Sequence, residues 1–134
     1  LLFNSRTRKN GIQLGAGCVG CVLIGNLLLK NIVARNRPCW IEEHAMLIAM
    51  PNDYSFPSGH TAASFASVTA LYLAGEKKLW KIALVLAVLI AFSRLYLYVH
   101  YPTDVLGGII TGAIAGYIGY KLTFIVQSKH RKKM

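Results

Sequence analysis

The chain has 134 residues, of which 54% are hydrophobic and 15% are charged, and its formal net charge is +10. Soluble domains usually carry about 25% charged residues, so this composition argues against an ordinary soluble domain. The positive charge would suit a nucleic acid, but the basic residues gather in short clusters beside apolar runs. No nucleic acid partner is therefore expected.

Four apolar runs divide the chain. They cover Gly11 to Leu29, Thr61 to Ala74, Leu79 to Val99 and Val105 to Val126. A helix needs about 20 residues to cross a bilayer; two runs reach this length, the first nearly does, and the second is short. The pattern predicts an all-α, polytopic transmembrane helix bundle with four spans, in helices at about 12–34, 58–74, 79–99 and 105–126.

A single membrane-embedded domain is expected over residues 1–134. The first residues, Leu1 to Phe3, are interpreted as the end of an earlier membrane helix. The full-length protein is then expected to have five or six spans, with the missing part before Leu1.

Small residues recur along the first and last apolar runs, at Gly15, Gly17, Gly20 and Gly25 and at Gly108, Gly112 and Gly116. In lipid, small residues at such spacing let helix backbones approach closely. These stripes predict helix-packing faces, either within one chain or between chains, so the oligomeric state stays open.

Three basic clusters indicate the topology: Arg6, Arg8 and Lys9; Lys77, Lys78 and Lys81; and Lys129, Arg131, Lys132 and Lys133. With four spans all three clusters fall on one side of the membrane. Cytoplasmic loops carry an excess of Lys and Arg, so this side and the C-terminus are predicted to be cytoplasmic. The clusters are also expected to contact anionic membrane lipids.

The cysteines are expected to be structural. Cys18 and Cys21 have the spacing of a redox or metal motif, but they lie in an apolar, glycine-rich helix with no His or further Cys nearby. Cys39 stands alone in the loop of residues 35–57. Helix packing therefore explains them better, and no metal site is predicted.

Ionisable groups gather at the outer ends of the predicted helices. They are Lys30, Arg37, His60, Arg94, His100 and Asp104. Each has an ordinary explanation by itself: Lys30 could reach the interface along its aliphatic stem, and Asp104 could cap a helix. Charged groups at membrane helices are costly unless they are paired or functional. Together, the cations, the histidines and one carboxylate suit a compact polyanion such as phosphate.

The stretch Pro57-Ser58-Gly59-His60 opens the second predicted helix. It could be only a turn with a helix cap. As a binding site, Gly59 would let the backbone approach a ligand, and the helix N-terminus would favour an anion. Ser58 would add a hydroxyl donor, and His60 would exchange a proton with the bound group.

These residues form three motifs: Lys30-x6-Arg37-Pro38, then Pro57-Ser58-Gly59-His60, then Ser93-Arg94-x5-His100-x3-Asp104. The chain resembles the type 2 phosphatidic acid phosphatase superfamily, most closely its small bacterial membrane members. The motifs are intact, in order and specific when taken together.

The resemblance implies a metal-independent membrane lipid phosphatase without a cofactor. His100 would attack phosphorus and form a phosphohistidine, Asp104 would orient His100, and His60 would protonate the leaving oxygen. Lys30, Arg37, Ser58, Gly59 and Arg94 would bind the phosphoryl group. The implied substrate is a lipid phosphate or pyrophosphate, such as undecaprenyl pyrophosphate, phosphatidylglycerophosphate or phosphatidic acid, bound at the outer face of the cell membrane.

Two alternatives remain. The superfamily includes soluble vanadium haloperoxidases, but the apolar spans of this chain disfavour that chemistry. A non-catalytic lipid-phosphate binding or transport protein is the other alternative, and a missing nucleophile or arginine would favour it. The charged residues Glu42, Glu43, His44 and Asp53 of the loop are interpreted as solvated. The sequence does not distinguish among the possible lipid substrates.

Overall fold

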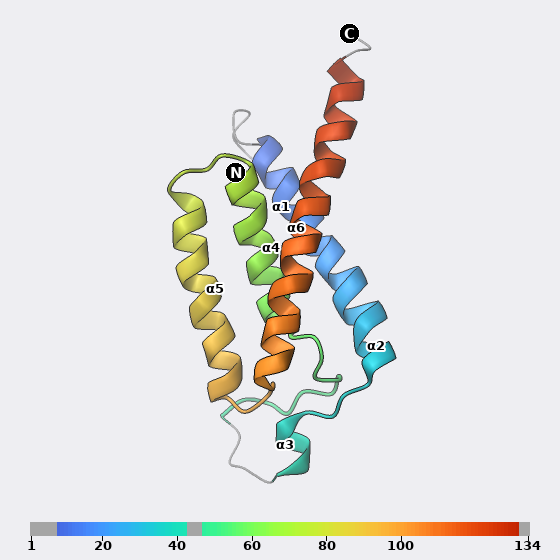
Figure 1. Cartoon of the computed structure of the whole chain (residues 1–134), viewed down its shortest axis with the longest axis vertical. Helices are drawn as coiled ribbons and strands as arrows, with labels where there is room; N and C mark the ends of the chain where they lie inside the picture. Colours follow the sequence, from blue (N-terminus) through green and yellow to red (C-terminus); the bar gives the residue numbers. More distant parts are fainter. Residues whose placement is uncertain (1–7, 43–46, 132–134) are drawn as a thin grey trace.

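The computed structural model describes residues 8–42 and 47–131, and every regular element in these two ranges is a helix. α1 (Arg8–Cys21), the π-helical η1 (Val22–Leu29) and α2 (Lys30–Val33) follow one another without a break. After the one-turn α3 (Pro38–Ile41) come α4 (Gly59–Leu73), α5 (Leu79–Tyr96) and α6 (Pro102–Arg131) (Figure 1). The predicted all-α bundle is confirmed. Leu1 to Phe3, Glu43 and His44 lie outside the described residues.

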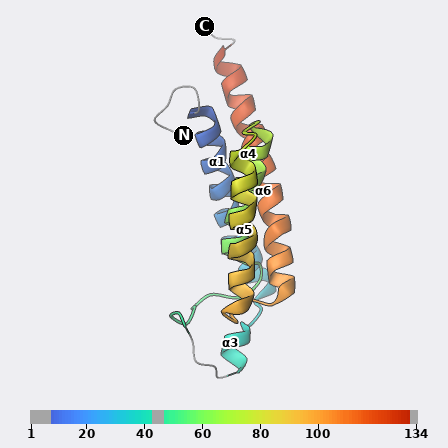
Figure 2. The ribbon, with the colours of Figure 1, turned by 90° about the vertical axis from the view of Figure 1, so that its left-hand side faces the viewer.

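Three stretches of the described residues are long and apolar enough to cross a membrane: Gly11–Ile41, Leu79–Tyr96 and Pro102–Ile125. The remaining expected span, α4, has 15 residues, so it is only about 22 Å long. It packs against α1, α5 and α6 (Figures 1 and 2), and it buries Thr61, Ala62, Ala66, Val68, Ala70 and Leu71. Because neighbouring helices cover much of it, α4 is the central helix of the bundle.

The predicted small-residue faces meet where α6 crosses α4 and α1. A Cβ atom on Gly108 would lie 2.7 Å from the carbonyl oxygen of Ser58, and one on Gly116 would lie 2.7 Å from that of Ala66. On α1, a Cβ atom on Gly17 would lie 3.2 Å from the Cα of Gly116. Only glycine allows backbones to approach this closely, so these positions set the spacing of the helices.

The thiols of α1 also pack against α4. The Cys21 thiol donates to the carbonyl oxygen of Ala62 at 3.4 Å, and Cys18 Sγ lies 3.8 Å from Ser67 Oγ. Cys18, Cys21 and Cys39 are all free thiols. This arrangement agrees with a packing role for Cys18 and Cys21.

Two boundaries differ from the sequence prediction. α5 ends at Tyr96 and not at Val99, because Tyr98 has a φ of 57°, a left-handed conformation that a helix cannot include. α6 begins at Pro102, three residues before the expected start, because proline suits the first turn of a helix. The resulting short turn places His100 between α5 and α6.

Candidate active site

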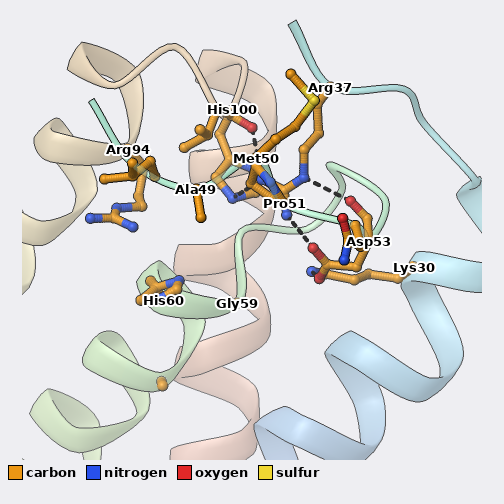
Figure 3. Close-up of a pocket in the computed structure, with 14 residues that line it drawn as sticks. Lys30, Arg37, Ala49, Met50, Pro51, Asp53, Gly59, His60, Arg94 and His100 are labelled. Carbon is orange, nitrogen blue, oxygen red and sulfur yellow. Dashed lines mark hydrogen bonds and ion pairs between the residues drawn. The ribbon is translucent and has the colours of Figure 1, made fainter. Parts of the chain in front are cut away.

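A cavity of about 740 Å³ lies at the end of the bundle where α2, α4, α5 and the loop before α4 meet (Figure 3). Most of the predicted site residues line it, although they come from distant parts of the sequence: Lys30, Arg37, Gly59, His60, Arg94 and His100. The remaining two, Ser58 and Asp104, are fully buried and do not line it. The fold therefore brings the predicted residues together at one place.

His100 lies in the turn between α5 and α6 and is 5% exposed. Its Nε2 atom is 3.2 Å from Arg37 Nη1, whereas its Nδ1 atom is 3.7 Å from Asp104 Oδ2. Burial lowers the pKa of His100, and the charge of Arg37 lowers it further against the opposing effect of Asp104, to about 4. At neutral pH the imidazole is therefore uncharged and keeps a lone pair for bonding.

Asp104 sits in the first turn of α6 and is held on both carboxylate oxygens. Arg35 Nη1 donates to Oδ1 at 2.9 Å, and the backbone N–H of Tyr101 donates to Oδ2 at 2.8 Å. Ser55 Oγ also donates to Oδ2, at 2.5 Å. Burying a carboxylate is costly unless its oxygens are hydrogen-bonded, and this set of partners fixes its orientation beside His100.

Arg37 connects the cavity wall to the His100 turn. Its Nη1 donates to the carbonyl oxygen of Val99 at 2.9 Å. On the other side, its Nε donates to the carbonyl oxygen of Asp53 at 2.7 Å, and its Nη2 pairs with Asp53 Oδ1 at 2.6 Å. Arg37 is 4% exposed, and these bonds fix the position of its guanidinium.

Asp53 also forms an ion pair with Lys30, so one carboxylate engages two of the predicted phosphate-binding cations (Figure 3). Partial burial raises the pKa of Asp53, but hydrogen bonds and charges from Lys30 and Arg37 outweigh this effect and hold the pKa below its ordinary value. The Asp53 side chain is 55% exposed, as expected of a solvated loop charge, but the sequence interpretation missed its pairing with Lys30 and Arg37.

His60 and Arg94 lie on the opposite side of the cavity from Lys30 and Asp53 (Figure 3). His60 is exposed in the first turn of α4, and Arg94 is half-buried near the end of α5. Arg94 Nε and Nη2 each donate to Ser93 Oγ at 3.2 Å. Cationic side chains therefore border the space in front of His100 on both sides.

Ser58 and Gly59 differ in their relation to the cavity. Gly59 lines it. Ser58 is fully buried: its Oγ accepts from Thr61 Oγ1 at 3.0 Å, and its N–H donates to the carbonyl oxygen of Asp104 at 3.0 Å. In this arrangement Ser58 joins α4 to α6, and its role as a phosphate donor stays a prediction.

Sequence reasoning missed the roles of Arg35, Asp53 and Ser55. Arg35 and Ser55 bond to Asp104, and Asp53 pairs with the cations. Residue type gave no signal for Ser55. The sequence gave no signal for Asp53 either, because no Lys or Arg lies between Arg37 and Lys77. For Arg35 the available signal was a second arginine close to Arg37.

Comparison with known proteins agrees with this arrangement. The family model of the PAP2 superfamily matches residues 11–127. The chain belongs to the PAP2 superfamily. This confirms the family resemblance recognised from the three motifs.

One relative and two solved structures show how far the similarity extends. The undecaprenyl-diphosphatase of Sulfolobus acidocaldarius is 33% identical over 91% of this chain, and the chain spans 59% of that protein's length. The crystal structure of Aquifex aeolicus LpxE has a TM-score of 0.75 and 31% identity, covering 90% of this chain and 72% of that one. The transmembrane PAP2 type phosphatidylglycerolphosphate phosphatase of Bacillus subtilis has a TM-score of 0.69 and 31% identity, covering 96% and 63%.

Proposed function

We propose that this PAP2 superfamily chain is an integral membrane phosphatase that hydrolyses a lipid phosphate or pyrophosphate through a phosphohistidine on His100. One observation carries the proposal: a buried, uncharged His100 turns Nε2 toward a cavity bordered by Lys30, Arg37 and Arg94. A neutral imidazole beside fixed cations can attack an anionic phosphoryl group, because the cations offset the repulsion between the attacking lone pair and the phosphoryl oxygens.

In the first step Nε2 of His100 forms a bond to phosphorus while the bond from phosphorus to the leaving oxygen breaks. His60 donates a proton to that oxygen, so that the lipid alcohol or lipid phosphate leaves without an extra charge. The positive charge that develops on His100 is stabilised by Asp104, whose carboxylate is already fixed by its partners. Asp104 thus acts as the orienting group of a catalytic triad does.

In the second step water attacks phosphorus, and the bond from phosphorus to Nε2 breaks. His60, now unprotonated, accepts a proton from the water. Inorganic phosphate leaves, and His100 returns to its neutral form. Arginine and lysine supply the charge stabilisation in both steps, so the proposed reaction requires no metal or cofactor.

The phosphoryl group is proposed to bind where Asp53 now meets Lys30 and Arg37. A carboxylate and a phosphoryl group both present paired anionic oxygens to a guanidinium, so the contacts of Asp53 mark a site built for such oxygens. Gly59 and Arg94 line the same cavity and would complete the binding of the third oxygen.

The names of the similar proteins support a lipid substrate with a phosphate or diphosphate group. Undecaprenyl diphosphate and phosphatidylglycerophosphate are the substrates these names suggest, and phosphatidic acid remains a third.

The cavity end is proposed to face the outside of the cell. In support, the α4–α5 connection, with exposed Lys77 and Lys78, lies at the opposite end of the bundle (Figure 1), as the excess of cytoplasmic Lys and Arg would require.

The experiment is phosphate release by the detergent-solubilised protein in the presence of a chelator. The panel comprises undecaprenyl pyrophosphate, phosphatidylglycerophosphate, phosphatidic acid and a soluble phosphate ester, with His100→Ala as control. Release that requires His100 is expected. Lipid binding without phosphate release by a well-folded sample would instead support a binding or transport protein.

Sidedness has its own test in intact cells. Asn52→Cys at the cavity is expected to react with a membrane-impermeant maleimide, and Lys77→Cys in the α4–α5 connection is expected to react only after permeabilisation. The reverse pattern would overturn the proposed orientation.

A further inference from the structure

Ser55 occupies the space between Asp104 and His100 and is fully buried. Its Oγ lies 2.5 Å from Asp104 Oδ2 and 3.4 Å from His100 Nδ1. The direct separation of Nδ1 from Oδ2 is 3.7 Å, which exceeds the range of about 2.7–3.2 Å for an N–H···O hydrogen bond. The Ser55 hydroxyl, at 3.4 Å, also lies beyond this range, but it is nearer to the ring than the carboxylate oxygen. The Ser55 backbone forms a hydrogen bond to His100 as well.

We propose that Ser55 is a positioning residue that transmits the orienting effect of Asp104 to His100 through its hydroxyl. The inference rests on the proposed function, because it assigns how the attacking histidine is held. Ser55 touches neither the cavity nor the reacting phosphorus, so it acts only through His100.

Hydrogen-bond chemistry fixes the direction of this chain of contacts. The Ser55 hydroxyl donates to Asp104 Oδ2, and a hydroxyl has only one proton to donate. The free lone pairs of the hydroxyl then face Nδ1 of His100, which must carry a proton to bond to them. Nε2 is thereby left unprotonated, as attack on phosphorus requires.

The cavity side of the ring demands the same tautomer. Arg37 Nη1 is 3.2 Å from Nε2, and a guanidinium can only donate. A proton on Nε2 would therefore point at another donor. Ser55 on one edge of the ring and Arg37 on the other both favour a proton on Nδ1, so the two contacts reinforce each other.

The position of Ser55 is itself fixed by the segment that carries Arg35. The backbone N–H of Ser55 donates to the carbonyl oxygen of Arg35 at 2.8 Å, while the Arg35 side chain pairs with Asp104 Oδ1 at 2.9 Å. The Arg35 guanidinium also stacks on the ring of Tyr101 at 4.0 Å. Arg35 thus holds both the Ser55 hydroxyl and the Asp104 carboxylate in place beside His100.

The test compares Ser55→Ala with Ser55→Thr, which keeps the hydroxyl. Ser67→Ala is the matched control, because Ser67 bonds within α4 to the carbonyl oxygen of Ala63. Readouts are kcat, KM and the tautomer of His100 from ¹⁵N chemical shifts in protein labelled at histidine. Ser55→Ala is expected to lower kcat about 10- to 100-fold, as for loss of a hydrogen bond to a charged group, with KM within about twofold.

In Ser55→Ala the population of the Nδ1-protonated form of His100 is expected to fall, although Arg37 still favours that form, while Ser55→Thr and Ser67→Ala keep the wild-type tautomer and kcat within about threefold. In an Asp104→Asn background, Ser55→Ala is expected to cost little more, because both residues act along one path. An unchanged tautomer in Ser55→Ala, or additive losses in the double variant, would overturn the proposal. The tautomer is measured without substrate. A wild-type protein that releases no phosphate would therefore refute the proposed function, whereas the tautomer of His100 in Ser55→Ala would still test the role of Ser55.

Discussion

Substituting Gly108 by alanine tests whether the α4–α6 contact sets the geometry of the site. The added Cβ would lie 2.7 Å from the carbonyl oxygen of Ser58 and 3.0 Å from the Cβ of Thr61. An ordinary contact is about 3.5 Å, so the start of α4 must move by about 0.8 Å. The Ser58–Gly59 turn stands between α6 and the cavity, so the displacement moves the cavity wall.

The expected magnitudes follow from this displacement. Overpacking of a tightly packed interface costs about 1–3 kcal/mol, which corresponds to a fall in melting temperature of about 4–12 °C for a chain of this size. The catalytic rate is more sensitive to such a displacement than stability is, since a misplacement of about 1 Å can lower the rate about 100-fold. Gly108→Ala is therefore expected to lower kcat/KM by about 10- to 100-fold while the protein stays folded.

Two further glycines provide controls. Gly116→Ala would meet the carbonyl oxygen of Ala66 at the same 2.7 Å, deeper in the bundle, whereas a Cβ on Gly15 has nothing within 4 Å. Thermal unfolding in detergent and phosphate release are measured on all three. Gly116→Ala is expected to lose similar stability but less activity, and Gly15→Ala neither. Equal activity in the Gly108 and Gly116 variants would refute the link between this contact and the site.

Three other predictions concern the ionisable groups. Asp53→Asn removes the carboxylate that competes for Lys30 and Arg37, so inhibition by inorganic phosphate is expected at about two- to fivefold lower concentration; a higher concentration would mean that Asp53 only holds the cations in place. His60→Ala is expected to slow phosphoenzyme formation most for poor leaving groups, and equal slowing for all leaving groups would argue against a general acid. Because the pKa of His100 is lowered to about 4, the neutral nucleophile persists as pH falls, and an NMR titration of His100 is expected to show protonation near pH 4; protonation near the ordinary 6.5 would contradict a buried neutral imidazole.

The sequence predicted the helices and the meeting of the motif residues because both follow from local patterns. Apolar runs of span length specify helices in lipid, and motif residues at the outer helix ends, such as Lys30 and His100, must share one face of a bundle. The predicted ends of the helices were less accurate than their central parts. The left-handed Tyr98 and the start of α6 at Pro102 depend on how the turn packs, which periodicity does not encode.

The contacts of the loop before α4 could not be predicted for a different reason. Asp53 and Ser55 lie in a polar segment without periodicity, so nothing local indicates which way each side chain points. Their partners, Lys30, Arg37 and Asp104, are distant in sequence. Only the folded arrangement, in which the loop crosses the end of the bundle, brings the hydroxyl to His100 and the carboxylate to the cations.

Trapping the phosphoenzyme tests the central claim most directly. The protein is mixed with lipid substrate labelled in the phosphoryl group to be transferred, quenched within one turnover in alkali, and mapped by peptide mass spectrometry. The account predicts an alkali-stable, acid-labile phosphoryl group on His100 that is absent from His100→Ala and forms more slowly in His60→Ala. Phosphate release by wild-type protein without any phosphoryl group on His100, or with one on a different residue, would contradict it.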